Sequence, residues 1–438
     1  MLLIYTPVIN NRINYIFKLI LSRILGVEYS ITAQFDEWHD YNGPKFCYCQ
    51  EYVGDELFFG QVPLLLNTGT KKIIIEPVMF EGIKAFFPVS ASASVFPFDP
   101  FAASFYLVSR YEEYLPFIRD MHGRFPASES LALRYGFLQK PVVNIWANQI
   151  RVVLQQRYSE LKFKKRHFTM IPTIDIDSAF AIRNKGFVRI MGGLIKSLYN
   201  RDKDNFKKRL KVLFGKENDP FDSFDFQLKI QQQYNFRPIY FVLMADYGSY
   251  DKNIPYQNKY FRDIVKLLAD YADVGIHTSY ASNDNPELLK IEVQRLSELL
   301  NREIQRSRQH FLRLEIPATY HNLLRLDIYN DYTMGFASQP GFRAGICDSF
   351  PFYDIDMEAE TPLMIHPFMI MEGTLADYLR LSSEEAFEHI RRLIDEVKAV
   401  DGTFISLWHN ESLGGQGQWA GWPEVYEKMI EYALNDSI

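Results

Sequence analysis

Two aspartates close a short apolar segment of the chain. The segment Pro172–Asp177 ends with Asp175 and Asp177, separated by one isoleucine. On a strand, side chains two positions apart lie on the same face, so both carboxylates would project together from its carboxyl end. Two adjacent buried negative charges repel each other and require a cation or a shared proton. The pair therefore indicates a metal or catalytic site, with solvated strand-end or turn-capping carboxylates as the alternative.

Two further apolar segments end in a histidine. His277 closes Val274–His277 and precedes Thr278, whereas His409 closes Thr403–His409. A single histidine in such a position is more often a hydrogen-bonded core residue than a ligand. Active sites of α/β proteins are built where parallel strands end, however, so three strands that each deliver an aspartate or a histidine predict one composite site.

The pattern around these segments predicts the elements that position them. Beyond about residue 166, short apolar runs alternate with amphipathic helices, which is typical of parallel strands with crossover helices. Asn285 with Pro286, and Ser382 with Glu385, are signals for the start of a helix. We expect an N-terminal α+β domain over 1–165 and an α/β domain over 166–438. The predicted strands are 168–177, 239–245, 274–277, 309–314 and 403–409.

Composition excludes several classes of protein. The 438 residues include 48 Lys and Arg against 54 Asp and Glu, a net charge of -6, which disfavours a nucleic-acid partner because such binding neutralises phosphates. Three cysteines are too few for a disulfide framework. The apolar stretch 16–25 is interrupted by charges and is shorter than the ~20 residues of a membrane span. No secretion signal is visible, so we expect a cytoplasmic protein.

The ordered motifs Thr173–Asp177, Gly275–Thr278, Arg308 and Leu407–His409 resemble those of the polysaccharide deacetylases, the NodB-homology group of carbohydrate esterase family 4. The resemblance covers residues 166–438. It implies an irregular (β/α) barrel and a bacterial hydrolase of carbohydrate metabolism. Such an enzyme removes acetyl groups from N-acetylated sugars or polysaccharide with a divalent metal, for which zinc, cobalt and nickel are the candidates.

The resemblance also implies a role for each matching residue. The implied catalytic residues are Asp175 as general base, His409 as general acid, Arg308 as the residue that orients the base, and Asp331 as the acidic residue that follows the arginine. The implied metal ligands are Asp177 and His277, with Thr278 as a neighbouring hydroxyl that stabilises the loop and faces the substrate.

The sequence departs from this family at the metal site. The second metal histidine of the family lies four residues after the first, where this chain has Ala281. His310 shares a predicted strand face with Arg308 and is the candidate for the missing ligand. Gln309 and His310 also replace the prolines expected after Arg308. The alternative function is therefore a catalytically impaired protein of this fold that acts as a glycan-binding or scaffold module.

Four residues outside the metal motifs are candidates for substrate contact. Arg343 lies in a glycine-flanked segment, and His366 begins a segment rich in Met, Glu and Gly. Trp408 precedes His409, and Trp419 lies in a glycine-rich loop where it could stack on a sugar ring. The alternatives are a tight turn with a salt bridge and a tryptophan that fixes the loop. A glycosidase fits poorly, because two aspartates on one strand face cannot flank a glycosidic bond.

Overall fold

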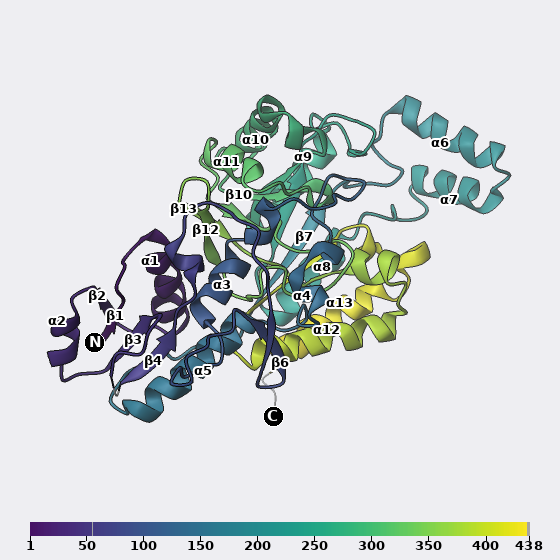
Figure 1. The fold of residues 1–438 in the computed structure, drawn as a ribbon. Coiled ribbons are helices and arrows are strands. Elements are labelled where there is room, and N and C mark those ends of the chain that lie inside the picture. Colours follow the sequence, from purple (N-terminus) through teal and green to yellow (C-terminus); the bar gives the residue numbers. More distant parts are fainter. Residues whose placement is uncertain (55, 436–438) are drawn as a thin grey trace.

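A nine-stranded sheet organises the larger part of the molecule (Figure 1). The structure is a computed structural model and describes residues 1–54 and 56–435. Every neighbouring pair in this sheet is parallel except β12 with β13. In sheet order the strands are β12 (Phe350–Asp354), β13 (Ala359–Ile365), β11 (Asn330–Asp331), β10 (Arg306–Gln309), β9 (Asp273–Thr278), β8 (Ile239–Leu243), β7 (Thr169–Ile176), β15 (Thr403–His409) and β14 (Ile370–Met371).

Helices between the strands allow this parallel pairing, because a parallel connection must cross back over the sheet. The helices of this part are α8 (Phe224–Tyr234), α9 (Lys259–Tyr271), α10 (Pro286–Leu300), α11 (Ala318–Leu324), α12 (Ser383–Lys398) and α13 (Trp422–Leu434). The predicted caps are confirmed: Asn285 accepts a hydrogen bond from the Leu288 amide, and Ser382 and Glu385 form a capping box. Strands β12 and β14 lie at the two ends of the sheet order and do not pair with each other within the described residues. The α/β class is therefore confirmed, whereas the closed barrel stays a prediction.

One predicted strand was placed wrongly, because β10 overlaps the predicted range only at Gln309. We predicted a strand over 309–314, but β10 ends at Gln309 and a 3-10 turn follows over His310–Leu312. Phe311 has a φ of 57° in this turn, which is incompatible with a continuing strand. The turn lifts His310 out of the strand.

The N-terminal part is built on a second, parallel sheet. Its order is β2-β1-β3-β4, and the helices α1 and α2 connect consecutive parallel strands, where the sequence predicted a mixed α+β fold. A separate antiparallel hairpin pairs β5 with β6. The elements are β1 (Leu2–Tyr5), α1 (Asn11–Phe17), a π-helix (Lys18–Ile24), β2 (Tyr29–Thr32), α2 (Phe35–Asp40), β3 (Lys45–Cys49), β4 (Leu57–Gly60), β5 (Pro77–Phe80), β6 (Ile83–Phe86), α3 (Pro100–Val108), α4 (Leu131–Arg134) and α5 (Val142–Arg157).

Short turns complete the fold. The 3-10 turns are Pro63–Leu66, Tyr111–Tyr114, Ala127–Glu129, Ala281–Asp284, His310–Leu312, Ser412–Gly414 and Gly417–Trp419, and a second π-helix covers Thr374–Tyr378. Between β7 and α8 the chain forms α6 (Phe187–Tyr199) and α7 (Lys203–Leu213), which project from the upper right of Figure 1. Within the described part of the chain, no helix has the length and apolar content that crossing a bilayer requires.

The two parts share one hydrophobic core and several buried polar contacts. Tyr15 donates a hydrogen bond from Oη to the Pro351 carbonyl oxygen at 2.8 Å. Glu113 pairs with Arg110 at 2.8 Å and with Arg343 at 2.8 Å, and all three side chains are about 98% buried, with 2% exposure each. The boundary between residues 165 and 166 stays a prediction, because the hydrophobic core is continuous across it.

We expect Glu113→Gln to destabilise the whole protein. Removing this carboxylate leaves the buried guanidinium group of Arg343 without its counter-charge and Arg110 paired with Glu112 alone, which costs ~3 to 5 kcal/mol of unfolding free energy. Urea unfolding followed by fluorescence measures the change. The matched control is Glu388→Gln, whose partner Arg391 is 39% exposed, and which should leave the midpoint unchanged. Equal midpoints for both variants would contradict the structural importance of the buried network.

Candidate metal centre

A cavity of about 260 Å³ lies at the carboxyl edge of the nine-stranded sheet. Asp177 follows β7, His277 lies in β9, His310 follows β10 and His409 ends β15, and all four side chains line the cavity. The parallel pairing of β15, β7, β8, β9 and β10 explains this convergence, because it brings the carboxyl ends of all five strands to one edge.

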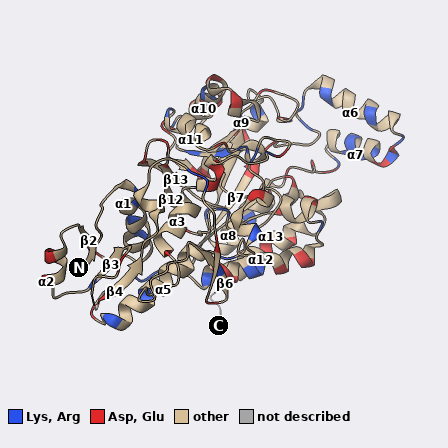
Figure 2. Ribbon diagram, viewed as in Figure 1, with Lys and Arg blue, Asp and Glu red and all other residues tan. Residues whose placement is uncertain are grey.

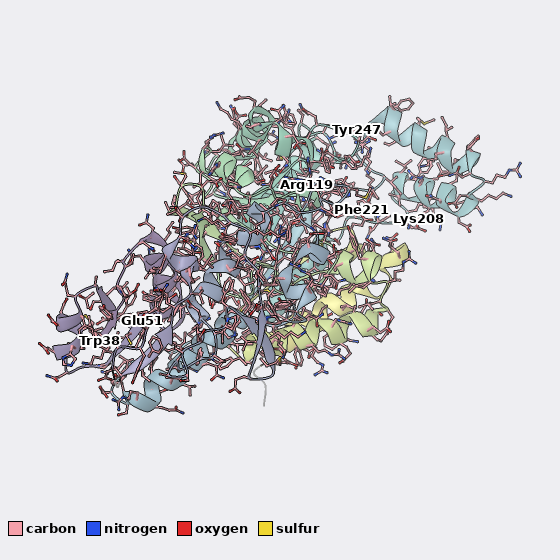
Figure 3. The ribbon with its side chains drawn as sticks, viewed as in Figure 1. Trp38, Glu51, Arg119, Lys208, Phe221 and Tyr247 are labelled. Carbon is pink, nitrogen blue, oxygen red and sulfur yellow. The ribbon has the colours of Figure 1, made fainter. Side chains whose placement is uncertain are left out.

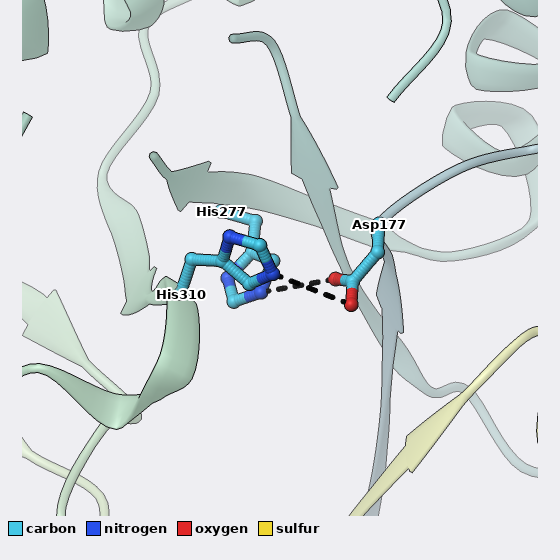
Figure 4. A group of neighbouring side chains, drawn as sticks. All are labelled: Asp177, His277 and His310. Atoms are coloured by element: carbon cyan, nitrogen blue, oxygen red, sulfur yellow. Dashed lines mark ion pairs between the residues drawn. The ribbon is translucent and has the colours of Figure 1, made fainter. Parts of the chain in front are cut away.

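Asp177, His277 and His310 form a candidate metal triad at this edge (Figure 4). One ligand atom from each residue lies within 4.8 Å of the others. Nε2 of His277 is 3.2 Å from Oδ1 of Asp177, and Nε2 of His310 is 3.4 Å from Oδ2. The structure thus brings His310 to the position where the resemblance left a ligand missing, whereas Ala281 lies in an exposed 3-10 turn.

Hydrogen bonds at the opposite ring nitrogens fix the orientation of both histidines. Nδ1 of His277 is 2.9 Å from the Arg308 carbonyl oxygen, and Nδ1 of His310 is 2.8 Å from Oδ1 of Asp251. Since both partners can only accept, each Nδ1 carries the proton and donates it. Nε2 is therefore the nitrogen that faces Asp177 and the cavity in both rings, and in the neutral ring it offers a lone pair, as in metal-binding histidines.

The charges of the triad favour a cation. Burial would raise the pKa of Asp177, but the positive charge of His310 and hydrogen bonds from His277 and His310 hold it well below its usual range. Burial would lower the pKa of His310, but the carboxylates of Asp177 and Asp251 raise it to about 9. Two nitrogens and a carboxylate oxygen are the donor set of zinc and related divalent ions, so these residues fit a metal.

Asp175, the other aspartate of the pair, is neutralised by an arginine. Asp175 accepts a hydrogen bond at 2.8 Å from Nη1 of Arg308, and both side chains are buried. Arg308 also donates from Nε to the Tyr332 carbonyl oxygen at 3.0 Å, which holds the guanidinium in place. Oδ2 of Asp175 is 3.6 Å from Nε2 of His277. Asp175 therefore lies directly behind the triad and does not line the cavity.

His409 faces the cavity from β15 with a buried carboxylate behind it. Its Nδ1 is 2.7 Å from Oε1 of Glu372, which also accepts the His409 amide and the Ser412 hydroxyl. Burial would lower the pKa of His409, but the Glu372 carboxylate raises it to about 10, with smaller contributions from Asp177 and Asp175. At neutral pH the imidazole is therefore protonated on both nitrogens, and Nε2 carries a proton that can be donated.

Of the other residues identified from the sequence, Trp419 lines the cavity and Thr278 lies behind its wall. Thr278 is buried, and its hydroxyl donates a 2.6 Å hydrogen bond to Oε1 of Gln309, which lines the wall. Trp419 lines the cavity and directs Nε1 toward Glu411 at 3.3 Å. Trp419 can therefore meet a ligand, whereas Thr278 acts on the cavity through Gln309.

The structure does not bring four other predicted residues to the cavity. Asp331 accepts hydrogen bonds from Ser307 and Thr333 inside the sheet. Arg343 pairs with Glu113 of the N-terminal part. His366 stacks on Tyr332 with ring centroids 4.2 Å apart, and Trp408 packs 5.0 Å from Tyr426 of α13. Because neighbours on a strand face opposite ways, Trp408 points to the helices while His409 points to the site.

Three residues at the site were not assigned from the sequence. Asp251 and Glu372 orient His310 and His409, and Arg124 comes from the N-terminal part to line the cavity. Nε of Arg124 pairs with Asp120 at 2.7 Å, and its Nη1 donates to the Phe311 carbonyl oxygen at 2.7 Å. Asp251 follows β8 by eight residues, so the strand-end pattern that identified the other ligands gave only a weak signal for it.

Comparisons with known proteins agree only in part with the sequence interpretation. Residues 2–159 match a model for a family of unknown function, DUF7033. No curated protein matches the chain. Similar solved structures include a protein assigned as a polysaccharide deacetylase from Mycobacterium smegmatis, with 13% identity over 61% of this chain and 85% of that chain and a TM-score of 0.40. The polysaccharide deacetylase Bc1974 from Bacillus cereus has 11% identity over 61% and 88%, with a TM-score of 0.30.

A protein described as a pseudoenzyme of carbohydrate esterase family 4 from Bacillus anthracis is also similar, with 11% identity over 60% of this chain and 61% of that chain and a TM-score of 0.27. The similar structures therefore include both deacetylases and a pseudoenzyme. At these TM-scores and identities, the similarity assigns neither a family nor an activity to this chain.

We expect His310→Ala to abolish stoichiometric zinc binding, because it removes one of three protein ligands. Asp251→Asn keeps all three ligands but loses the carboxylate that orients His310, so we expect a ~10- to 100-fold weaker affinity. Titration calorimetry with zinc measures both effects. His39→Ala is the matched control, because the His39 side chain is 67% exposed and pairs with Asp40 at the surface of the N-terminal part. Wild-type affinity in His310→Ala would exclude this triad.

We expect Glu372→Gln to lower the pKa of His409 from about 10 toward the usual histidine value, because it removes the adjacent negative charge. A histidine pKa raised by folding stabilises the protein fully below ~6.5, and this contribution disappears as the pH rises through the folded value. The stability difference between wild type and variant should therefore shrink as the pH approaches 10. NMR titration of the metal-free protein measures the pKa directly, and an unchanged midpoint would contradict the assignment.

Proposed function

We propose that the protein is a metal-dependent hydrolase that removes acetyl groups from an N-acetylated saccharide. The observation that supports this proposal most strongly is that one cavity contains both a metal triad and a protonated histidine. Asp177, His277 and His310 provide the three ligands, and His409 faces the same cavity from the neighbouring strand. Structural ion networks do not need a proton donor beside an accessible metal site, whereas hydrolysis does.

A divalent metal bound by the triad would act as a Lewis acid toward the acetyl carbonyl and a hydrolytic water. The protein residues then have three tasks. They hold the acetylated nitrogen in the cavity, accept a proton from the attacking water, and return a proton to the nitrogen when the C–N bond breaks.

Asp175 is the proposed proton acceptor. Its Oδ1 is held by Arg308 at 2.8 Å, so Oδ2 is the oxygen left toward the triad, 3.6 Å from Nε2 of His277. The guanidinium of Arg308 is a positioning group, because it orients the carboxylate and places a positive charge beside it without reaching the cavity. Arg308 is itself fixed by the Tyr332 carbonyl oxygen, which limits the freedom of the proposed base.

His409 is the proposed proton donor. With Nδ1 bonded to Glu372, only Nε2 is available to the leaving nitrogen. The raised pKa of about 10 keeps that nitrogen protonated at neutral pH, and an amine leaving group requires such a proton. After transfer, Glu372 favours reprotonation of the imidazole.

The cavity wall supports a saccharide as the ligand. Trp419 supplies an aromatic surface on one side, and Tyr378, Glu411 and Asp377 supply hydroxyl and carboxyl groups that can bond sugar hydroxyls. The volume of about 260 Å³ suits one sugar residue with its acetyl group. We infer from Arg124 that the N-terminal part contributes to substrate binding rather than serving only as a separate module.

The second candidate function is a glycan-binding or scaffold protein without catalysis. Ala281 and the burial of Asp175 favour it, since the family's usual histidine is absent and the proposed base does not line the cavity. In that case His310 would hold a metal or a proton for structural reasons only.

We expect Asp175→Asn to lower the rate of acetate release by ~100-fold or more, because it removes the proton acceptor while leaving the three ligands in place. Release of acetate from an N-acetylated oligosaccharide measures the rate, and calorimetry with zinc checks that the variant still binds metal. Asp263→Asn is the matched control: this aspartate is exposed on α9 and does not line the cavity. Wild-type activity in Asp175→Asn would remove Asp175 from the mechanism, and no acetate release by the wild-type, metal-loaded protein would favour the binding module.

A further inference from the structure

We propose that the helical hairpin formed by α6 and α7 docks the protein on a membrane surface that carries anionic lipids. The hairpin is inserted between β7 and α8 and has no role in the chemistry described above (Figure 1). Two independent features of it, an uncovered apolar face and an excess of positive charge, together specify this partner.

The apolar face belongs to α6. Phe187, Met191, Ile195 and Leu198 recur at the spacing of one helical face. They are exposed by 78%, 38%, 61% and 59% respectively, and Ser197 is the only buried residue of the helix. Val188 and Tyr199 extend the same face and are also exposed. Scattered exposed apolar residues are ordinary, but a continuous face of this kind normally marks a binding surface.

The other side of α6 is closed by α7. Gly193 faces this helix so closely that a Cβ atom there would lie 2.4 Å from Nη1 of Arg209. The sides of α6 and α7 that face each other are therefore covered by this contact. The apolar face of α6 is left without a partner in the described structure.

Positive charge is concentrated on the hairpin that carries this face. Between 187 and 213 the chain has eight Lys and Arg but only two acidic residues, although its overall net charge is -6. Figure 2 shows the blue segments on both helices, and Figure 3 labels Lys208 on α7. Within residues 1–54 and 56–435, Lys196, Lys203, Lys207 and Lys208 form no ion pair, whereas Lys211 pairs with Glu217 at 2.6 Å. These four lysines favour a negatively charged partner.

The combination selects a bilayer interface over other partners. An amphipathic helix with an aromatic and aliphatic face lies in the plane of the headgroups with its apolar side in the acyl boundary, and positive charge elsewhere on the hairpin attracts it to anionic lipids. A second copy of the hairpin would bury the apolar face equally well, but it would bring two positively charged hairpins together. Charge therefore favours lipid over self-association.

The base of the hairpin is held to the part of the protein that is built on the nine-stranded sheet. Arg189 donates from its guanidinium to the carbonyl oxygens of Lys252 and Asn253, both at 2.8 Å, and lies over the Tyr247 ring at 4.1 Å. Asp219 accepts the backbone amides of 181–183. Asp177 and Phe187 are separated by only nine residues. Docking would consequently hold the cavity at a defined position beside the membrane.

Vesicle co-sedimentation of the full-length protein tests the proposal without any enzymatic assay. We expect binding to phosphatidylcholine vesicles that contain phosphatidylglycerol, weak binding to phosphatidylcholine alone, and weaker binding when the salt is raised from ~0.1 M to ~1 M. The triple variants Phe187→Ser/Ile195→Ser/Leu198→Ser and Lys203→Gln/Lys207→Gln/Lys208→Gln should each lower the partition coefficient by ~10-fold or more. Circular dichroism checks that both variants remain folded.

Matched controls carry the same changes elsewhere. Lys259→Gln/Lys266→Gln/Lys290→Gln removes three exposed lysines from α9 and α10, and Ile74→Ser/Ile118→Ser/Met357→Ser removes three exposed apolar side chains, so both should bind vesicles as the wild type does. The proposal is overturned if the wild type does not bind anionic vesicles, or if the hairpin variants bind as well as it does. It is also overturned if ultracentrifugation finds a wild-type dimer that only the hairpin variants disrupt, without any vesicle binding.

Discussion

Two carboxylates at the end of one buried strand are the constraint on which the candidate site depends. Asp175 in β7 and Asp177 just after it both lie beside Nε2 of His277, so their negative charges are close together and need positive charge from elsewhere in the fold. The two carboxylates are balanced by different kinds of positive charge. Arg308 neutralises Asp175 permanently, whereas Asp177 faces two histidine nitrogens that can hold either a proton or a metal. Asp175 is therefore a fixed, oriented carboxylate, whereas Asp177 belongs to a site whose cation can be exchanged.

The parallel sheet makes this arrangement possible. Strands β9 and β10 run beside β7 and β8 in the same direction, so a histidine from β9, an arginine from β10 and a histidine just after β10 all reach the same edge. Each imidazole is oriented from behind by a group that can only accept a hydrogen bond, namely the Arg308 carbonyl oxygen, Asp251 or Glu372. The N-terminal part adds Arg124 to the wall, and the shared core fixes its position.

Much of this could be predicted from local sequence patterns. The strands that end in Asp177, His277 and His409 are visible as apolar runs, and the helix starts at Asn285 and Ser382 follow from capping chemistry. Long-range partners leave no such local signal, so the pairing of Arg343 with Glu113, 230 positions away, was not foreseen. The position of Trp408 could have been predicted, because strand alternation places its side chain on the opposite face of the sheet from His409. The turn at Phe311, which brings His310 to the triad, depends on a backbone conformation that the sequence does not display.

The most direct test of the central claim is anomalous diffraction at the zinc edge from crystals soaked with zinc. The account predicts one strong peak ~2.0 to 2.2 Å from a carboxylate oxygen of Asp177 and from Nε2 of both His277 and His310. A peak that excludes His310, or ordered side chains at this edge with no zinc among them, would contradict it.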